Sequence, residues 1–510
     1  MEHKIEQKIV AVFRPFIRNF LCILSILSIL LAPSYAREIP AGQTVESLGV
    51  GVAAKILCSA IFISNRSEEE ALANSVWMPE FITPDQAKNI TDIDIDRDAQ
   101  KVTLEYNNQF KRTTLYTGSQ GCTILPDGFT DVQFDPTPVK SRLPAAHRTD
   151  WPMGDRVSTS ACQLATPVKE KLEPSFCDEL QEAADIAFGD RGTATTSLLV
   201  VHKGNLIFEQ YKDGITKDMP LESWSMGKSL TAMLIGRLVQ LGYIDHMDVA
   251  PIDEWRKSED ARKYIRISDL LQMSSGLKFS GGRFNPEDYK NDDYPEHMLV
   301  YTSAFNTTDL ILSAPSEFLP GKLGRYRNSD PLALIHIMRT VLASDKDYLS
   351  FPQHELFDKI GARHFTLETD AWGLFLSSGY NYGTGRDWAR LGQLMLNKGK
   401  WDGDQLIPED YVEFVTTPAP GWHGKYHRSG SYGGQLWLNN GSYLKQYTSL
   451  PPDAYYFSGS GANKVMIIPS LDLVIVRMGH TSGQEKAWMT ESAVYDQIIR
   501  AMKIKSQNHH

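Results

Sequence analysis

Ser225-Met226-Gly227-Lys228 begins the stretch that decides the fold, because a long segment of helical periodicity follows it. Its apolar residues recur at helical spacing as far as Gly242: Leu230, Met233, Leu234, Ile235, Leu238, Val239 and Leu241. Residues three apart share one helical face, so the Lys228 amine would lie beside the Ser225 hydroxyl. A desolvated lysine can take the proton of a serine and make it a nucleophile. The alternative is a capping serine beside a solvated lysine.

The spacing S-x-x-K also occurs at two other places in the chain. They are the pairs Ser275/Lys278 and Ser442/Lys445. Both are predicted to lie in a loop or at a strand edge, because neither precedes a sustained helical pattern. The copy at Ser225 is therefore the candidate for catalysis.

The composition is that of an ordinary globular protein. The chain has 510 residues, of which 42% are hydrophobic and 22% charged, which argues against disorder. Its length predicts two structural units. The formal net charge is −10, and the first 36 residues carry four basic and two acidic side chains, which leaves −12 for the remainder. A chain this acidic, without basic runs, is not expected to bind nucleic acid or an anionic membrane surface.

The first 36 residues have the pattern of a signal peptide. Basic residues precede an apolar run from Phe20 to Leu31, and Ser34 and Ala36 fit a cleavage site. The run is too short to span a bilayer comfortably, and no other segment is predicted to cross one. Removal of residues 1–36 would leave a periplasmic or secreted protein without a stable membrane anchor. The alternative is an uncleaved N-terminal anchor.

Four cysteines remain once the signal peptide is removed: Cys58, Cys122, Cys162 and Cys177. An even number in an exported chain suggests two disulfides, for which three pairings are possible. The expected pairs are Cys58–Cys122 and Cys162–Cys177, and free buried thiols are the alternative. The chain has no Cys-x-x-Cys motif, so neither a zinc site nor a thioredoxin-like site is predicted. No metal and no cofactor are expected.

Residues 37–150 are predicted to form a small α+β unit, named the N-terminal module below. Val50–Ile63 is an apolar segment of mixed character, and Ile93–Leu115 alternates as strands do. A linker rich in Pro, Arg and Asp follows. Apart from its cysteines, the module contains no motif that indicates catalysis or ligand binding. It could stabilise the fold or form a wall of the substrate site.

Residues 151–510 are predicted to form an α/β (α+β) unit, named the C-terminal domain. Its expected strands are Thr196–His202 and Leu206–Glu209, and segments near 433–439, 455–458, 463–468 and 472–478. Its expected helices include Pro174–Phe188 and Lys486–Met502, and a helical, loop-rich insertion runs from about 245 to 390. Strands at both ends with helices between them favour one antiparallel sheet flanked by helices.

Tyr326 is the second candidate for catalysis. It follows a Pro-Gly turn and precedes an apolar segment, Pro331–Leu342, that is predicted to be a helix. A loop residue at the start of a helix is well placed to project into a cleft. The same Tyr-x-Asn pattern occurs at Tyr106 and Tyr289, and an ordinary packed tyrosine is the alternative.

Gly459 and Ser460 form the third candidate, in a Gly- and Ser-rich turn between two predicted strands. Glycine at a strand edge lets a ligand approach the backbone closely. A free N–H in this turn, together with the N–H of Ser225 at the helix N-terminus, could hold an oxyanion. The alternative is an ordinary β-turn.

These three pieces, in this order, resemble the superfamily of serine β-lactamases and penicillin-binding D,D-peptidases, which carries the S-x-x-K signature. The similarity is to its class C-like branch, which includes 6-aminohexanoate-dimer hydrolases and related esterases. Ile267–Leu277 and Arg386–Gly392 also look like that branch. The resemblance covers roughly residues 165–505 and implies a β-lactamase/transpeptidase-like sheet with a helical subdomain.

The resemblance also implies a role for each residue of the motifs. Ser225 would be the nucleophile, Lys228 its proton acceptor and Tyr326 a shared acid/base. Asn328 would line the site and orient the substrate. The N–H groups of Ser225 and Ser460 would hold the oxyanion, with the Gly459–Ser460 turn closing the site.

One departure from the family pattern narrows the range of substrates that we expect. β-Lactamases and D,D-peptidases usually carry Lys-Thr-Gly on the strand that borders the site, whereas Ala454–Gly459 has no lysine. Lys464 is expected to point elsewhere. Without a cation for a carboxylate, penicillin-like substrates are disfavoured and esters or linear amides are favoured.

The sequence therefore predicts an exported serine hydrolase that cleaves a small-molecule amide or ester through a Ser225 acyl-enzyme. The alternatives are a β-lactamase or D,D-peptidase on cell-wall-type substrates, and a catalytically silent binding or sensor domain. His297, His423 and His427 are expected outside the catalytic group, and no G-x-S-x-G motif surrounds Ser225. No oligomeric state is predicted.

Overall fold

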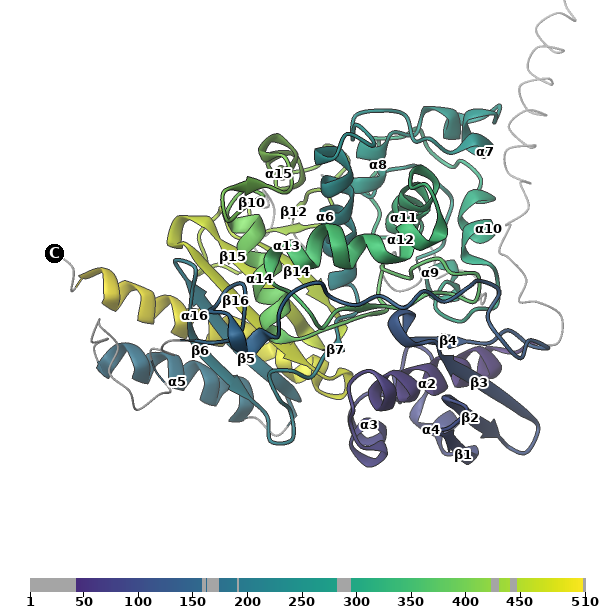
Figure 1. Ribbon diagram of the computed structural model, residues 1–510, viewed down its shortest axis with the longest axis horizontal. Helices are drawn as coiled ribbons and strands as arrows, with labels where there is room; N and C mark the ends of the chain where they lie inside the picture. Colours follow the sequence, from purple (N-terminus) through teal and green to yellow (C-terminus); the bar gives the residue numbers. More distant parts are fainter. Residues whose placement is uncertain are drawn as a thin grey trace, which may run out of the picture. The chain divides into compact units, whose positions relative to one another are not determined.

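The computed structural model describes residues 43–157, 162, 174–189, 192–281, 295–422, 431–440 and 447–507 (Figure 1). The expected signal peptide lies outside the described residues, as do Tyr289, His423, His427 and the pair Ser442/Lys445. Residues 39–510 make up one compact unit.

A seven-stranded sheet forms the centre of the C-terminal domain. Its order is β12-β13-β14-β15-β16-β5-β6, and all neighbouring strands are antiparallel. The strands are β5 Thr195–His202, β6 Asn205–Tyr211, β12 Ser431–Tyr432, β13 Trp437–Leu438, β14 Tyr455–Gly459, β15 Asn463–Ile468 and β16 Leu473–Gly479. The early hairpin β5–β6 joins the late strands through β16, as Figure 1 shows. The prediction of one antiparallel sheet with strands from both ends of the domain is confirmed.

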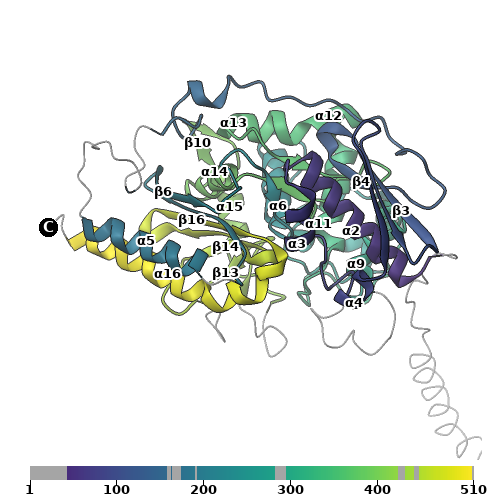
Figure 2. The same ribbon diagram turned by 90° about the horizontal axis from the view of Figure 1, so that it is seen from below.

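Helices cover both faces of this sheet. Val465 and Ile467 of β15 belong to the core shared with α14 (Gly385–Leu396), whereas Met466 and Ile468 belong to the core beneath α5 (Pro174–Gly189) and α16 (Gln484–Gln507). Side chains alternate across a strand, so the apolar run of β15 fills two cores. Figure 2 shows α5 and α16 side by side along one face. Both helices were predicted, with slightly shorter bounds.

The helix predicted after Ser225 is α6, Met226–Gln240. It is buried on nearly all sides, and it packs against α11 (Ser329–Val341) and β14. The remaining helices are α7 Asp253–Arg256, α8 Ile267–Leu271, α9 Glu296–Leu299, α10 Thr307–Leu312, α12 Asp345–Phe351, α13 Asp358–Ile360 and α15 Glu409–Val415. The smaller sheets are β7 Leu221–Glu222, β9 Asn381–Gly383 and β8 Thr366–Leu367, in that order, and β10 Lys400–Trp401 with β11 Asp404–Gln405.

The N-terminal module packs one long helix on a four-stranded antiparallel sheet. The helix is α2, Val45–Phe62, capped by Thr44, and shorter helices are α3 Glu68–Asn74 and α4 Pro84–Ala87. The strands are β1 Ile90–Asp96, β2 Lys101–Tyr106, β3 Phe110–Tyr116 and β4 Cys122–Ile124. Among the described residues, α2 alone is long and apolar enough to cross a membrane, but 83% of it is buried inside the structure.

Two disulfides occur, and both are the expected pairs. Cys58 of α2 bonds to Cys122 of β4, and Cys162 bonds to Cys177 of α5. The first joins the helix of the N-terminal module to its sheet. The second fixes α5 to the chain that precedes it.

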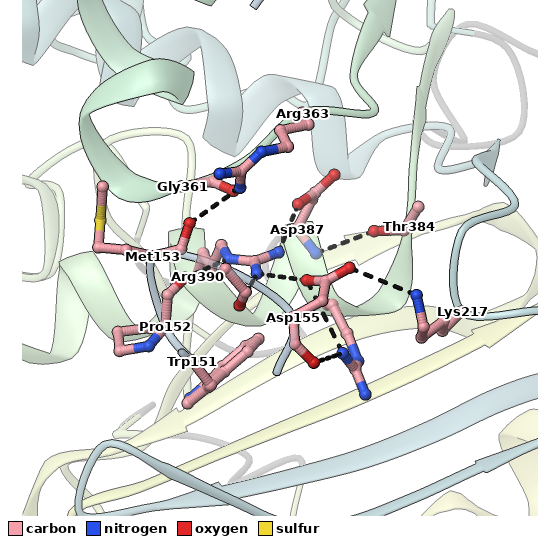
Figure 3. Close-up of polar contacts among 12 residues, drawn as sticks. Trp151, Pro152, Met153, Asp155, Lys217, Gly361, Arg363, Thr384, Asp387 and Arg390 are labelled. Atoms are coloured by element: carbon pink, nitrogen blue, oxygen red, sulfur yellow. Dashed lines mark hydrogen bonds and ion pairs between the residues drawn. The ribbon is translucent and has the colours of Figure 1, made fainter. Parts of the chain in front are cut away.

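An extended segment, residues 126–157, connects the module to the C-terminal domain and is held by arginines. Arg390 of α14 donates to Pro152 O (2.7 Å), to Gly154 O (2.8 Å) and to an Asp155 oxygen (2.7 Å). Figure 3 shows this group with Asp387, which accepts from Arg390 at 2.7 Å. Arg390, held by Asp387 of the same Arg386–Gly392 stretch, therefore anchors the backbone of residues 152–155.

Candidate active site

Ser225 stands at the turn that joins β7 to α6. It is the N-cap residue of α6 and its side chain is partly exposed, while the residues on either side are buried. Trp224 before it has φ +49°, a conformation unusual for a bulky residue. Ser223 donates both its N–H (2.9 Å) and its hydroxyl (2.8 Å) to Asn381 O. These contacts fix the approach to the helix and leave the Ser225 hydroxyl accessible.

Lys228 lies beside this hydroxyl, as the helical spacing predicts. Its Nζ is 3.1 Å from Ser225 Oγ and 2.8 Å from Ser378 O. The side chain is buried, and burial holds the pKa of Lys228 well below its ordinary value. A neutral amine can donate an N–H to Ser378 O and keep its lone pair for the Ser225 proton. A serine hydroxyl beside a neutral amine is an arrangement that permits general-base activation.

Tyr326 lies on another side of the Ser225–Lys228 pair. Its ring centroid lies 4.9 Å from Lys228 Nζ, and it packs against the rings of His297 (6.0 Å), Tyr432 (6.3 Å) and Trp437 (5.6 Å). Burial raises the pKa of Tyr326, and a hydrogen bond with Ser225 only partly opposes this. The phenol is therefore protonated at neutral pH, so it is suited to give a proton to a reacting group.

Asn328 stands at the start of α11, two residues after Tyr326. It is fully buried, and its Nδ2 donates to His297 O at 2.6 Å. Tyr301, whose hydroxyl lies 3.0 Å from Ser378 Oγ, also forms a hydrogen bond with Asn328. The expected role of Asn328 in orienting a substrate stays a prediction.

The turn after β14 lies against the start of α6. A Cβ atom on Gly459 would come within 2.0 Å of Ser223 O and 3.1 Å of the Ser225 nitrogen, so only glycine fits there. Ser460 follows directly and begins the short turn Ser460–Ala462. The backbone that bears the two expected oxyanion donors is thereby brought together.

Lys464 lies beside the bordering strand but on its far face. Its Nζ is 3.0 Å from Ser458 Oγ and 3.3 Å from a Glu491 oxygen. Side chains two apart share a face, so Ser458 and Lys464 lie with Tyr456 and Met466 on the face covered by α16. The lysine is engaged inside the fold, as expected for one that points away from Ser225.

Three residues near Ser225 have no motif that would identify them in the sequence. They are Tyr301, Ser378 and Trp437, which contribute a hydroxyl, a carbonyl and a partly exposed indole. The run Ser377-Ser378-Gly379 contains only small residues, which is typical of close backbone packing and was the one available signal. Ser275 of a second S-x-x-K copy lies in a loop, where its hydroxyl donates to Asp330 at 2.8 Å.

Metal ligands are not grouped anywhere in the part of the chain that the structure describes: no three His, Cys, Asp or Glu residues come together there. The groups that do lie together around Ser225 are its own hydroxyl, the Lys228 amine and the Tyr326 phenol.

Comparison with known proteins gives consistent results. The family model "Beta-lactamase" matches residues 176–495, which is more than half of the chain. A 6-aminohexanoate-dimer hydrolase of Paenarthrobacter ureafaciens is 25% identical over 301 residues, covering 56% of this chain and 72% of that protein. A solved Bacillus anthracis protein, assigned as a 6-aminohexanoate-dimer hydrolase, has a TM-score of 0.50 at 22% identity, over 72% of this chain and 89% of that one.

A family VIII carboxylesterase is also similar in structure, with a TM-score of 0.45 at 16% identity over 64% of this chain and all of that one. The family match includes α6, Tyr326 and the strands β14–β16. The chain therefore belongs to the Beta-lactamase family of serine hydrolases.

Proposed function

We propose that this protein hydrolyses a small-molecule amide or ester through a covalent acyl-enzyme on Ser225. The observation that carries the proposal is the contact of Lys228 Nζ with Ser225 Oγ at 3.1 Å, made by a buried amine that forms no ion pair with any acid in the described part of the chain. A buried lysine of lowered pKa is a competent general base.

In the first half-reaction the Ser225 Oγ attacks the substrate carbonyl carbon while its proton passes to Lys228 Nζ. The carbonyl oxygen takes up the negative charge, and the N–H groups of Ser225 and Ser460 stabilise it. The bond to the leaving nitrogen or oxygen then breaks. The leaving group takes up a proton through Tyr326, which Lys228 replenishes, and an ester of Ser225 remains.

In the second half-reaction water attacks this ester. Lys228 accepts a proton from the water, the carbonyl carbon passes through a second tetrahedral state, and the bond to Ser225 Oγ breaks. The proton returns to the serine, so the enzyme is restored and a carboxylic acid is released. No other reactant is needed for the cycle.

The surroundings of Ser225 favour a substrate with an apolar body. Tyr326, Tyr432 and Trp437 form an aromatic wall, and Trp437 is partly exposed at the edge of β13. Neither β14 nor β15 carries a cation on the face nearer to Ser225, because their one basic residue, Lys464, is on the far face. Linear amides or esters therefore fit better than penicillin-like substrates.

Export to the periplasm or the medium is part of the proposal. Two disulfides occur in the described residues, and disulfides persist in oxidising compartments. The basic and apolar pattern of residues 1–36 supports the same location.

The test compares the mature protein with Ser225→Ala and with Ser229→Ala. Ser229 is one turn further along α6 and donates to Gln435 O, so its variant controls for loss of one buried hydroxyl. Substrates are nitrophenyl esters, the 6-aminohexanoate dimer and a chromogenic cephalosporin.

Ester or amide turnover that is lost in Ser225→Ala and kept in Ser229→Ala is the expected result. Preferential turnover of the cephalosporin would favour the β-lactamase or D,D-peptidase alternative. If no substrate is cleaved and a fluorophosphonate probe leaves Ser225 unlabelled, the protein is a silent binding domain instead.

A further inference from the structure

The position of Lys228 is set by the backbone and not by a charged partner. Burial is the one influence on its pKa, and its amine donates to Ser378 O at 2.8 Å. A lysine side chain has four flexible carbons, so its contacts decide where its nitrogen lies. The shortest contact of Lys228 Nζ is with Ser378 O, ahead of Ser225 Oγ at 3.1 Å and the Tyr326 ring at 4.9 Å. The geometry of Ser378 therefore determines the geometry of the base.

The segment Ser377–Asn381 that supplies this carbonyl is fitted closely to the start of α6. A Cβ atom on Gly227 would lie 1.9 Å from Asn381 Nδ2 and 2.2 Å from Ser377 O. Thr231 of α6 is 3.1 Å from Ser377 Oγ. The segment and the first turns of the helix consequently move as one body.

Tyr301 holds this segment through two hydrogen bonds. Its hydroxyl lies 3.0 Å from Ser378 Oγ, and its carbonyl accepts from the Tyr380 hydroxyl at 3.0 Å. A Cβ atom on Gly379 would come within 2.5 Å of the Tyr301 hydroxyl, so glycine is required for this approach. Tyr301 thus fixes the residue whose carbonyl holds Lys228.

The N-terminal module reaches the same place through Phe81. The Phe81 ring stacks on Trp224 at 6.4 Å, directly before the serine, and meets the ring of Tyr301 edge-on at 6.1 Å. Trp224 and Tyr301 contact each other edge-on at 6.3 Å. Phe81 is buried, so it completes an aromatic cluster behind Ser225 and Lys228.

A second contact from the module supports the other end of the segment. Lys55 Nζ lies 3.5 Å above the ring of Tyr380 and forms an ion pair with Glu368. The Glu368 N–H donates to Tyr380 O at 3.0 Å, and its carbonyl accepts from Leu376 N at 2.8 Å. Tyr380 in the segment and Leu376 directly before it are therefore both bonded to Glu368, which Lys55 of the module contacts.

We infer that Tyr301 and Phe81 are positioning residues for Lys228, and that the N-terminal module is a working part of the active site. The inference rests on the proposed function of Ser225 and Lys228. Tyr301 acts through Ser378, and Phe81 acts through Tyr301 and Trp224. A small displacement of a base from its nucleophile costs a large factor in rate, so loosening this support lowers kcat.

The first test compares Tyr301→Phe with Tyr411→Phe. Tyr411 is a matched control because it is buried, its hydroxyl donates to Ala232 O at 2.7 Å, and that contact lies further along α6. We expect kcat of Tyr301→Phe on a nitrophenyl ester to fall about tenfold with KM within about twofold of the starting value. Tyr411→Phe keeps its kcat.

The pH profile gives a readout that a purely structural role would not move. Without the hydroxyl of Tyr301 the segment loosens and water reaches Lys228, which brings the pKa of the amine back toward its ordinary value. The acidic limb of kcat/KM in Tyr301→Phe is therefore displaced to higher pH. The rate of Ser225 labelling by a fluorophosphonate shows the same displacement.

The second test compares Phe81→Leu with Phe176→Leu. Phe176 of α5 is equally buried but belongs to the core on the other side of the sheet. We expect similar decreases in melting temperature for the two variants. Only Phe81→Leu lowers kcat and displaces the pH profile.

Two outcomes separate failure of this inference from failure of the proposed function. If Ser225→Ala keeps its activity, or Ser225 is never labelled, the proposed function fails and this inference fails with it. If Ser225→Ala is inactive but Tyr301→Phe and Tyr411→Phe have the same kcat and pH profile, the inference alone is overturned. A change confined to KM would overturn it equally.

Discussion

Lys55 of α2 and Glu368 beside β8 form an ion pair that is shielded almost completely from water. Their side chains are 1% and 0% exposed. Ser59 Oγ (2.7 Å) and the Cys122 N–H (2.9 Å) donate to the other carboxylate oxygen of Glu368. Burial lowers the pKa of Lys55 and raises that of Glu368, so each charge depends on the other. The pair joins the N-terminal module to the C-terminal domain.

Removing one member of this pair is predicted to destabilise the protein strongly. Lys55→Met leaves a buried carboxylate without its cation and is expected to cost about 3–5 kcal/mol of unfolding free energy. The double variant Lys55→Met/Glu368→Leu is expected to recover most of that loss. Urea unfolding of the single and double variants measures both effects. A double variant less stable than Lys55→Met would contradict this account.

Replacing the base is predicted to abolish turnover without unfolding the chain. Lys228→Arg puts an always charged guanidinium beside Ser225, which cannot accept a proton at any working pH. We expect kcat/KM to fall at least about a thousandfold. In the unchanged enzyme, activity rises with pH as Lys228 loses its proton, because burial has lowered its pKa. The exposed Lys257 provides the control as Lys257→Arg, and equal activity of the two variants would refute the assignment.

Gly459 is predicted to tolerate no side chain. The Cβ of Gly459→Ala would lie 2.0 Å from Ser223 O, so β14 must move away from the start of α6. We expect the rate of ester cleavage to fall about a hundredfold through loss of the oxyanion site. Gly189→Ala is the control, since nothing lies within 4 Å of its Cβ. Steady-state kinetics on a nitrophenyl ester decide the matter, and full activity of Gly459→Ala would exclude this turn from the site.

Glu222, three residues before Ser225, is predicted to make the fold sensitive to acid. Its burial favours the neutral form, but Arg66 and His480 hold the pKa of Glu222 at about 2. The folded pKa lies below the ordinary value of 4.5, so the stabilisation is complete above pH 4.5 and is lost as the pH falls toward 2. It amounts to about 3 kcal/mol.

The acid effect is measured by urea unfolding at pH 7, 4.5 and 3. Glu222→Gln is expected to be less stable than the unchanged protein at pH 7 and to lose less stability on acidification. An equal loss in both proteins would show that other carboxylates cause it.

The sequence predicted the sheet and the serine–lysine pair because both depend on local patterns. Alternating or continuous apolar runs define β5, β15 and β16, and helical spacing places Lys228 beside Ser225. The helix α2 was missed, since its apolar residues surround the whole helix and leave no polar face. The roles of the site residues, and the boundary of the N-terminal module at residue 150, stay predictions.

The surroundings of Lys228 could not be predicted in the same way. Ser378 and Tyr301 are 150 and 73 positions from Lys228 in the chain, and each contributes an ordinary carbonyl or hydroxyl. Contacts of this kind arise from tertiary packing, which no short motif records. The buried hydrogen bond from Asn328 Nδ2 to His297 O, 31 positions away in the chain, illustrates the point.

Because β5 pairs with β16, the central sheet can form completely only after nearly the whole chain has been synthesised. His202 is opposite Leu473, so the seven-stranded sheet against which α6 packs includes strands from both extremes of the C-terminal domain. In a nascent chain that does not yet include β16, the apolar core between α6 and the central sheet is incomplete. Such a chain would expose apolar surface and depend on chaperones, and nonsense mutations upstream of residue 473 are expected to yield aggregates instead of partly active enzyme.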